Sequence, residues 1–217
     1  HTLANRLSEM GDREGALASV REAIEIYREL AAKNPDAFRP DLARSLDNLA
    51  THQSLMGYRE GTLAPAREAV EIYRELAAKN PDAFRPNLAI SLNNLAISLS
   101  EMGDREGALA PTREAVEICR ELTAKNPDAF RQNLAISLNN LAIRLSDMGD
   151  REGAQAPGRE AVETLAPVFL RYPQALAPWM ATIARNYRNR CEDCDEEADA
   201  ALLDPIAAAF AALQSDE

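Results

Sequence analysis

The chain has 217 residues, 46% of them hydrophobic and only 5% aromatic, and a formal net charge of −11 from 24 basic and 35 acidic side chains. Alanine and leucine must therefore supply most of a core, and the scarcity of residues that favour strands predicts an all-α fold. Binding to nucleic acid depends largely on lysines and arginines that neutralise phosphates. The charge therefore excludes DNA, RNA and anionic membrane surfaces as expected partners and favours a neutral or basic protein segment.

Cysteine content and hydropathy indicate the compartment in which the chain is expected. The three cysteines, Cys119, Cys191 and Cys194, are an odd number in a chain large enough to fold without disulfides. They fit a reducing compartment, so we expect a cytoplasmic protein. No apolar run approaches the roughly 20 residues of a membrane span, and no signal peptide is visible. Because the sequence opens on His1 inside a helical pattern, we expect it to be part of a longer protein.

A 46-residue repeat organises the chain. The string Asn-Pro-Asp-Ala-Phe starts at Asn34, Asn80 and Asn126. Residues 80–111 and 126–157 differ at only four of 32 positions, Pro86/Gln132, Ser98/Arg144, Glu101/Asp147 and Leu109/Gln155. We predict a repeat array over residues 1–190, followed by an acidic segment and a C-terminal capping helix over 191–217. The array divides into units of about 1–33, 34–79, 80–125 and 126–171 and a degenerate copy over 172–190.

Each unit contains two helical patterns. Leucines at 88, 92, 95 and 99 recur every three or four residues and predict an amphipathic helix over 87–102. Gly103 can adopt the left-handed conformation that ends a helix, and Asp104 can cap a second helix over 105–124. Asn126-Pro127 ends that second helix. A linker of about two residues makes the two helices antiparallel, and stacked pairs complete one another's core.

The second helix of three copies contains a proline four residues after a glycine. Proline removes one helical hydrogen bond and clashes with the carbonyl four residues earlier, and glycine relaxes that clash. We expect a bend that either sets the curvature of the array or acts as a hinge. The pairs are Gly61/Pro65, Gly107/Pro111 and Gly153/Pro157.

The pattern resembles the tetratricopeptide repeat family. It is carried by Leu92, Leu95, Ala96, Leu99, Gly103, Ala108, Thr112, Ala115 and Pro127. The unit is longer than the family's usual one and is similar to the long-repeat subclass found in kinesin light chains. The resemblance implies a right-handed superhelical solenoid of antiparallel helix pairs that binds proteins. We expect no cofactor and no enzymatic activity.

The resemblance also implies that the first helix of each pair lines a concave groove. Asparagines at one register could bond the backbone of an extended peptide, because an amide offers both a donor and an acceptor. Alternatively, they bond between neighbouring helices. The candidate peptide-binding residues are Asn48, Asn93, Asn94, Ile97, Glu101, Asn139, Asn140, Ile143 and Asn186. The same face includes Thr51, Ser54, Leu55, Ile90 and Asp147, and the acids Glu101 and Asp147 favour a basic segment.

The sequence contains no recognisable catalytic or metal-binding set. The only histidines are His1 and His52, too few to assemble a triad. Cys191-x-x-Cys194 is the one suggestive motif, but a zinc site needs four ligands and the other candidates lie repeats away. We therefore expect no metal site and no catalytic residue.

The two ends of the array suggest further hypotheses. We expect Asp204-Pro205 to open an alanine-rich helix that reaches about Leu213 and caps the last pair, and Trp179 to pack inside the degenerate copy. A truncated helix over 2–10 leaves the opposite end uncapped, which favours self-association there. The chain could also serve as the sensor or regulatory arm of a larger signalling protein.

Overall fold

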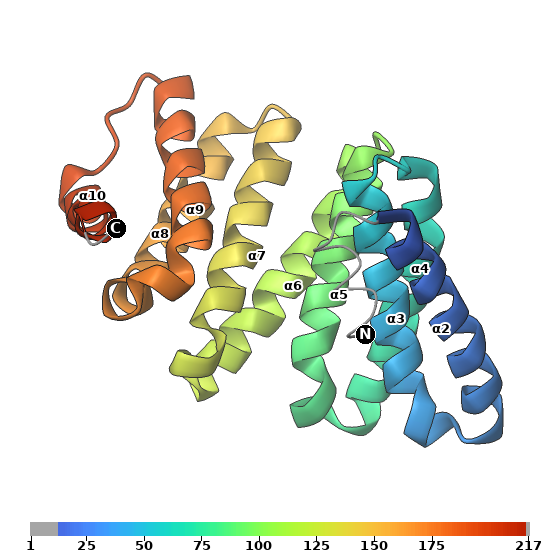
Figure 1. Cartoon of the computed structure of the whole chain (residues 1–217). Helices are drawn as coiled ribbons and strands as arrows, with labels where there is room; N and C mark the ends of the chain where they lie inside the picture. The colour runs from blue at the N-terminus through green and yellow to red at the C-terminus, as the bar shows by residue number, and fades with distance from the viewer. Residues whose placement is uncertain (1–12, 216–217) are drawn as a thin grey trace. The chain divides into compact units, whose positions relative to one another are not determined.

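The computed structural model describes residues 13–215, and every regular element among them is a helix (Figure 1). This confirms the predicted all-α fold for the described part of the chain. The predicted helix over 2–10, and with it the uncapped end, lies outside the described residues. The helices are α2 (Arg13–Lys33), α3 (Pro35–Leu55), α4 (Arg59–Lys79), α5 (Pro81–Glu101), α6 (Arg105–Lys125), α7 (Pro127–Asp147), α8 (Arg151–Arg171), α9 (Pro173–Asp193) and α10 (Ala200–Ser215).

The first helix of each pair begins earlier than the leucine pattern predicts. α5 and α7 start at Pro81 and Pro127, directly after asparagines that serve as N-caps. The side-chain oxygen of Asn80 accepts from the backbone N–H of Ala83 at 3.4 Å, and Asn126 makes the equivalent bond. Proline suits the first helical position because its missing N–H would have no helical partner there. The Asn-Pro-Asp-Ala-Phe string is therefore the start of a helix rather than a connection.

The ends of the first helices follow the prediction. Gly57, Gly103 and Gly149 have φ angles of 76°, 85° and 86°, in the left-handed region that glycine adopts without steric cost. Asp104 and Asp150 follow directly, and each carboxylate accepts from a backbone N–H three residues later at 2.9 Å. These caps begin α6 and α8, so the turn between paired helices is specified by local sequence.

The chain forms two compact units, His1–Pro111 and Thr112–Glu217, with the boundary inside α6. In the N-terminal unit, α2, α3, α4 and α5 pack in chain order, and α3 also packs against α5. In the C-terminal unit, α7, α8 and α9 do the same, with α7 against α9. Within each unit, consecutive first helices thus lie side by side.

Leucine and alanine fill the core, as the composition predicts. Leu92 and Leu138 occupy equivalent positions on α5 and α7, and both are 0% exposed. Small alanines such as Ala66, Ala108 and Ala154 are also fully buried and let helices approach closely. The prolines of the glycine–proline pairs lie within the continuous helices α4, α6 and α8, and the bend itself stays a prediction.

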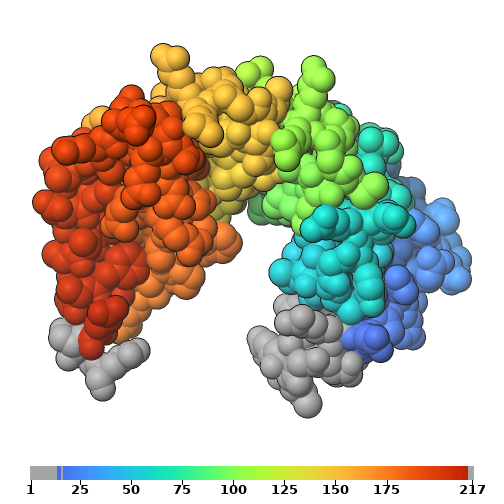
Figure 2. Space-filling view, turned by 90° about the horizontal axis from the view of Figure 1, so that it is seen from above, coloured from blue at the N-terminus to red at the C-terminus, as the bar shows by residue number. Residues whose placement is uncertain are grey.

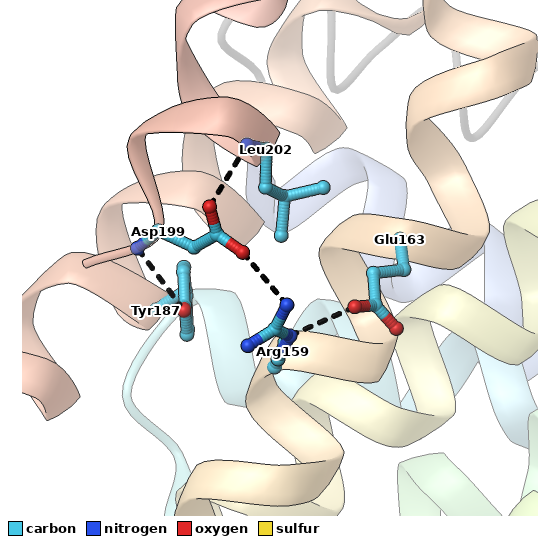
Figure 3. A network of polar contacts seen from close by, with 5 residues as sticks. All are labelled: Arg159, Glu163, Tyr187, Asp199 and Leu202. Atoms are coloured by element: carbon cyan, nitrogen blue, oxygen red, sulfur yellow. Dashed lines mark hydrogen bonds and ion pairs between the residues drawn. The ribbon is translucent and has the colours of Figure 1, made fainter.

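The capping helix α10 starts at Ala200, five residues before the predicted first position, Pro205. Its N-cap is Asp199, whose carboxylate accepts from the N–H of Leu202 at 3.3 Å and pairs with Arg159 at 2.7 Å (Figure 3). The backbone N–H of Asp199 donates to the Tyr187 hydroxyl, and Arg159 also bonds Glu163. These contacts with α8 and α9 outweigh the local Asp204-Pro205 signal.

α10 packs against both α8 and α9, and in the space-filling view it lies in red beside their orange surface (Figure 2). The prediction for Trp179 is wrong, since that side chain is 45% exposed. Leu176, Met180 and Ile183 fill the core side of α9 instead. Among the described helices, none combines the length and apolarity needed to span a membrane.

Candidate functional site

A buried carboxylate joins the first helices of the N-terminal unit. Asp47 of α3 is 8% exposed, and both of its carboxylate oxygens lie 2.7 Å from the Ser91 hydroxyl of α5. Asn94 of α5 also bonds this carboxylate. Burial raises the pKa of Asp47 to about 6, although the hydrogen bonds from Ser91 and Asn94 oppose that shift. We call this set the α3–α5 junction.

A neutral amide takes the same place in the C-terminal unit. Asn139 of α7 accepts at Oδ1 from Asn186 Nδ2 and from Arg190 Nη2, each at 3.1 Å. Arg190 is 6% exposed, and burial lowers its pKa to about 10. Gly158 of α8 lies against this guanidinium, where a Cβ would be in van der Waals contact at 3.4 Å. We call this set the α7–α9 junction.

The predicted asparagines therefore fall into two groups. Asn93 and Asn139 are buried, with exposed fractions of 8% and 6%, and Asn139 bonds to residues of α9. The row residues Asn48, Asn94, Asn140 and Asn186 are half-buried. Asn94 and Asn186 each bond to the preceding first helix, which is the alternative role that the sequence left open.

A pocket opens beside Asn94 on the surface shared by α3 and α5. Its volume is about 180 Å³. Leu55 is 69% exposed at its edge and Ile97 is 36% exposed, while Ile90, one turn before Asn94, is 46% exposed. The pocket is lined by Ala50, Thr51, Ser54, Leu55, Asn94, Ile97 and Ser98. The structure thus gathers two of the predicted site residues, Asn94 and Ile97, into one concave apolar feature.

Glu101 lies next to this pocket, one turn beyond Ile97 on α5. The hydroxyl of Ser54, which lines the pocket, donates to Glu101 Oε1 at 2.5 Å. The corresponding acid on α7, Asp147, instead pairs with Arg144 of its own helix at 3.5 Å. Ile143, the equivalent of Ile97 on α7, is half-buried.

Sequence reasoning did not single out Arg190 or Gly158. Arg190 stands where the other copies have His52, Ser98 and Arg144, so the repeat gives no rule for that position. The signal that could have found the contact is the simultaneous change to glycine at 158, where the earlier copies carry Ala66 and Thr112.

The cysteines form no reactive cluster in the described part of the chain. Cys119 and Cys191 are buried, Cys194 is half-buried, and all three are free thiols. Burial raises the pKa of the Cys119 and Cys191 thiols, which keeps them protonated and weakly nucleophilic. Residues 13–215 contain no group of three or more His, Cys, Asp or Glu side chains placed to hold a metal ion.

Stacked helix pairs with glycine-ended first helices define an all-α solenoid of the repeat-protein class. The sequence profile of the tetratricopeptide repeat matches residues 1–36, 88–127 and 134–165. The chain belongs to the tetratricopeptide repeat family. No curated protein sequence matches the chain.

Solved structures show the same fold at low sequence identity. BtubC (BKLC) from P. vanneervenii has a TM-score of 0.65 and 22% identity, over 94% of this chain and 74% of that one. A protein of Podosopora anserina described as a kinesin light chain with nearly identical TPR-like repeats has a TM-score of 0.59 and 21% identity, over 99% and 94%. The apo form of RapI has a TM-score of 0.58 and 16% identity, over 98% and 62%. The likeness to kinesin-light-chain repeats confirms the predicted fold, and membership of the family supports a general role in protein–protein interaction.

Proposed function

We propose that the chain is a scaffold that binds an extended segment of a partner protein along its first helices. The observation that carries this proposal is the pocket between α3 and α5, with exposed Leu55 and Ile97 beside Asn94. Burying such apolar side chains against a partner gains about 25 cal/mol for each Å² removed from water. Concave apolar surfaces with a few polar groups are also the usual form of a binding site.

The opposite side of the pairs has a different character. The second helices α2 and α4 are joined by an ion pair between Arg28 and Glu68 at 2.7 Å, and α6 and α8 by Arg120 and Glu160 at 2.6 Å. Such exposed pairs suit a solvated surface that contributes little energy of its own. Exposed apolar side chains occur on both sides, so the pocket between α3 and α5 is the feature that favours the first-helix side as the surface that receives a partner.

The asparagine row can contribute to both packing and binding. A carboxylate can only accept hydrogen bonds, so Asn94 must use its NH₂ group toward Asp47. Asn186 likewise donates through Nδ2 to Asn139. In both residues the amide oxygen is then the atom left to accept a backbone N–H of the partner segment. For Asn94 and Asn186 the proposed role in the row is therefore that of an acceptor.

Selection of peptides from a random display library against the purified chain tests the proposal. We expect enriched peptides that bind with 1:1 stoichiometry by calorimetry. Leu55→Ala combined with Ile97→Ala should weaken them about 10- to 100-fold, since truncating two apolar contacts removes about 1.4–2.8 kcal/mol. Asn94→Ala would be a poorer test, because it also removes a hydrogen bond from the buried Asp47.

The matched control truncates exposed apolar side chains on second helices. Ile26 of α2 is 51% exposed and Leu170 of α8 is 46% exposed. Ile26→Ala with Leu170→Ala should leave the affinity of the selected peptides unchanged. Peptides that respond equally to both double variants, or no enrichment at all, would refute binding along the first helices.

A further inference from the structure

We infer that the pocket between α3 and α5 selects a lysine side chain of the bound segment. Its aliphatic stem would lie against Leu55 and Ile97, and its ammonium group would bind Glu101. The inference rests on the proposed function, because it names the residue that the partner presents at this site.

The pocket has the two-part character that a lysine needs. Ala50, Leu55 and Ile97 supply apolar wall, and Ser54 and Ser98 supply hydroxyl groups. Glu101 is held beside them by the 2.5 Å bond from Ser54. Lysine buries its four-carbon stem along apolar surface while its charged end seeks polar partners. A volume of about 180 Å³ exceeds that of an engineered cavity of roughly 150 Å³ that accepts benzene.

Glu101 has no cationic partner among the described residues. Its only hydrogen bond there is the one from Ser54 to Oε1, and Oε2 is shielded from solvent without a hydrogen-bond partner. A shielded carboxylate oxygen without a partner is costly, so an arriving cation gains more here than at a solvated acid. The terminal torsion of glutamate is broad, so the carboxylate can turn an oxygen toward the pocket, and the Ser54 hydroxyl can rotate to keep its hydrogen bond.

The neighbouring copy shows how the same acid is neutralised internally. Asp147 of α7 pairs with Arg144, whose side chain is only 12% exposed. In α5 the residue at the arginine position is Ser98, so that internal cation is missing. Two of the four differences between the near-identical stretches 80–111 and 126–157 fall on this one pair of positions. They replace a self-contained ion pair with an acid next to an open pocket.

Lysine fits the arrangement better than arginine. Arginine's planar fork is best matched by a carboxylate with both oxygens available. Here Ser54 already occupies Oε1. The ammonium of lysine is a compact charge with three donors, which can bind one carboxylate oxygen and the Ser54 hydroxyl without the two-oxygen match that arginine needs.

The test uses four mixtures of fluorescent peptides, random except for one central position held as Lys, Arg, Glu or norleucine. Norleucine has the same aliphatic stem as lysine without the charge. We expect the Lys mixture to bind the full chain about 10-fold more tightly than the norleucine mixture by anisotropy. Glu101→Gln, a variant of the same shape, should reduce that ratio to about one while leaving norleucine binding unchanged.

Asp147→Asn is the control, because it removes the same formal charge from the equivalent position of α7. It should leave the preference for lysine intact. All four mixtures could bind equally well, and Leu55→Ala with Ile97→Ala could abolish that binding. This result would overturn the lysine inference and keep the proposed function. Preference for the Arg or Glu mixture would also overturn it. No binding of any mixture would overturn both.

Discussion

The α3–α5 and α7–α9 junctions occupy the same register of the repeat but are held together by opposite charges. In the N-terminal unit a buried carboxylate, Asp47, accepts hydrogen bonds from Ser91 and Asn94. In the C-terminal unit a buried guanidinium, Arg190, donates to the neutral Asn139. The repeat therefore fixes where a polar group is buried between first helices, while nearby residues decide its charge.

The difference between the two junctions follows from the loss of one hydrogen-bond donor, a serine hydroxyl. Ser91 of α5 corresponds to Ile183 of α9, which has no hydroxyl to offer. Arg190, two turns further along α9, supplies a hydrogen bond to Asn139 instead. Both junctions thus satisfy a buried acceptor, as buried polar groups require.

Of the changes at the two junctions, Asp47→Asn should have the largest effect on the free energy of unfolding. It gives α3 the residue that α5 and α7 carry at the same register. Burial raises the pKa of Asp47 from 3.8 to about 6. The folded state therefore holds this proton more tightly than the unfolded state, and the carboxylate destabilises the fold fully above pH 6 and not below about pH 4. A shift of this size corresponds to at most about 3 kcal/mol.

We expect the variant to be more stable by about 1–3 kcal/mol at pH 7, with the gain shrinking as the pH falls from 6 to 4. Urea denaturation of both proteins at several pH values measures it. A gain that stays constant with pH would show that desolvation of Asp47 is not its source.

Asn139→Asp should have an intermediate effect at the other junction. It places a carboxylate beside Arg190, which has no acidic partner in the described part of the chain. A charge-assisted bond is about twice as strong as a neutral one, and desolvation of the new carboxylate offsets part of the gain. We expect stabilisation of about 1 kcal/mol at pH 7 by denaturant unfolding.

The pH dependence of this gain should be opposite to that at Asp47. The guanidinium would lower the pKa of the introduced carboxylate below its unfolded value of about 4, so the gain is lost as the pH falls below that value. Combining Asn139→Asp with Arg190→Met should remove it. Stabilisation that survives the second change would exclude Arg190 as its cause.

Tyr58→Asp should have the smallest effect on stability, and it acts at the start of the second helix α4. In the C-terminal unit Asp150 caps α8 through the N–H of Gly153 at 2.9 Å. At the same register of the N-terminal unit, Tyr58 makes no side-chain cap for α4. We expect about 1 kcal/mol of stabilisation, measured as a higher melting temperature. Tyr58→Asn should give a similar gain, whereas Tyr58→Ala, which cannot cap, should not.

The helix ends could be predicted in part. Glycine at 103 and aspartate at 104 have the predicted roles because each acts through its own backbone and the next few residues. The starts of α5 and α10 were misplaced for different reasons. Asn80-Pro81 ends α4 and equally begins α5, and the start of α10 depends on contacts of Asp199 with α8 and α9.

For the candidate site, the sequence predicted which residues share one face of a helix, but not their contacts. The register placed Asn94, Ile97 and Glu101 on one side of α5, and the structure brings the first two into the pocket with Glu101 beside it. Sequence could not show that Asn93 and Asn139 are buried or that Asn94 bonds Asp47. Those contacts join residues about 46 positions apart and depend on how closely α3 approaches α5 and α7 approaches α9.

The repeat, the pairing of helices and the turn between them can be derived from the amino-acid sequence alone. These follow from periodic leucines, left-handed glycines and capping side chains, whose effects reach only a few residues along the chain. The packing of the helices sets which polar side chains bond between them, which sign of charge is buried at each junction, and where a pocket stays open. Burial and hydrogen bonding depend on atoms contributed by neighbouring helices, so near-identical copies such as α5 and α7 present different surfaces.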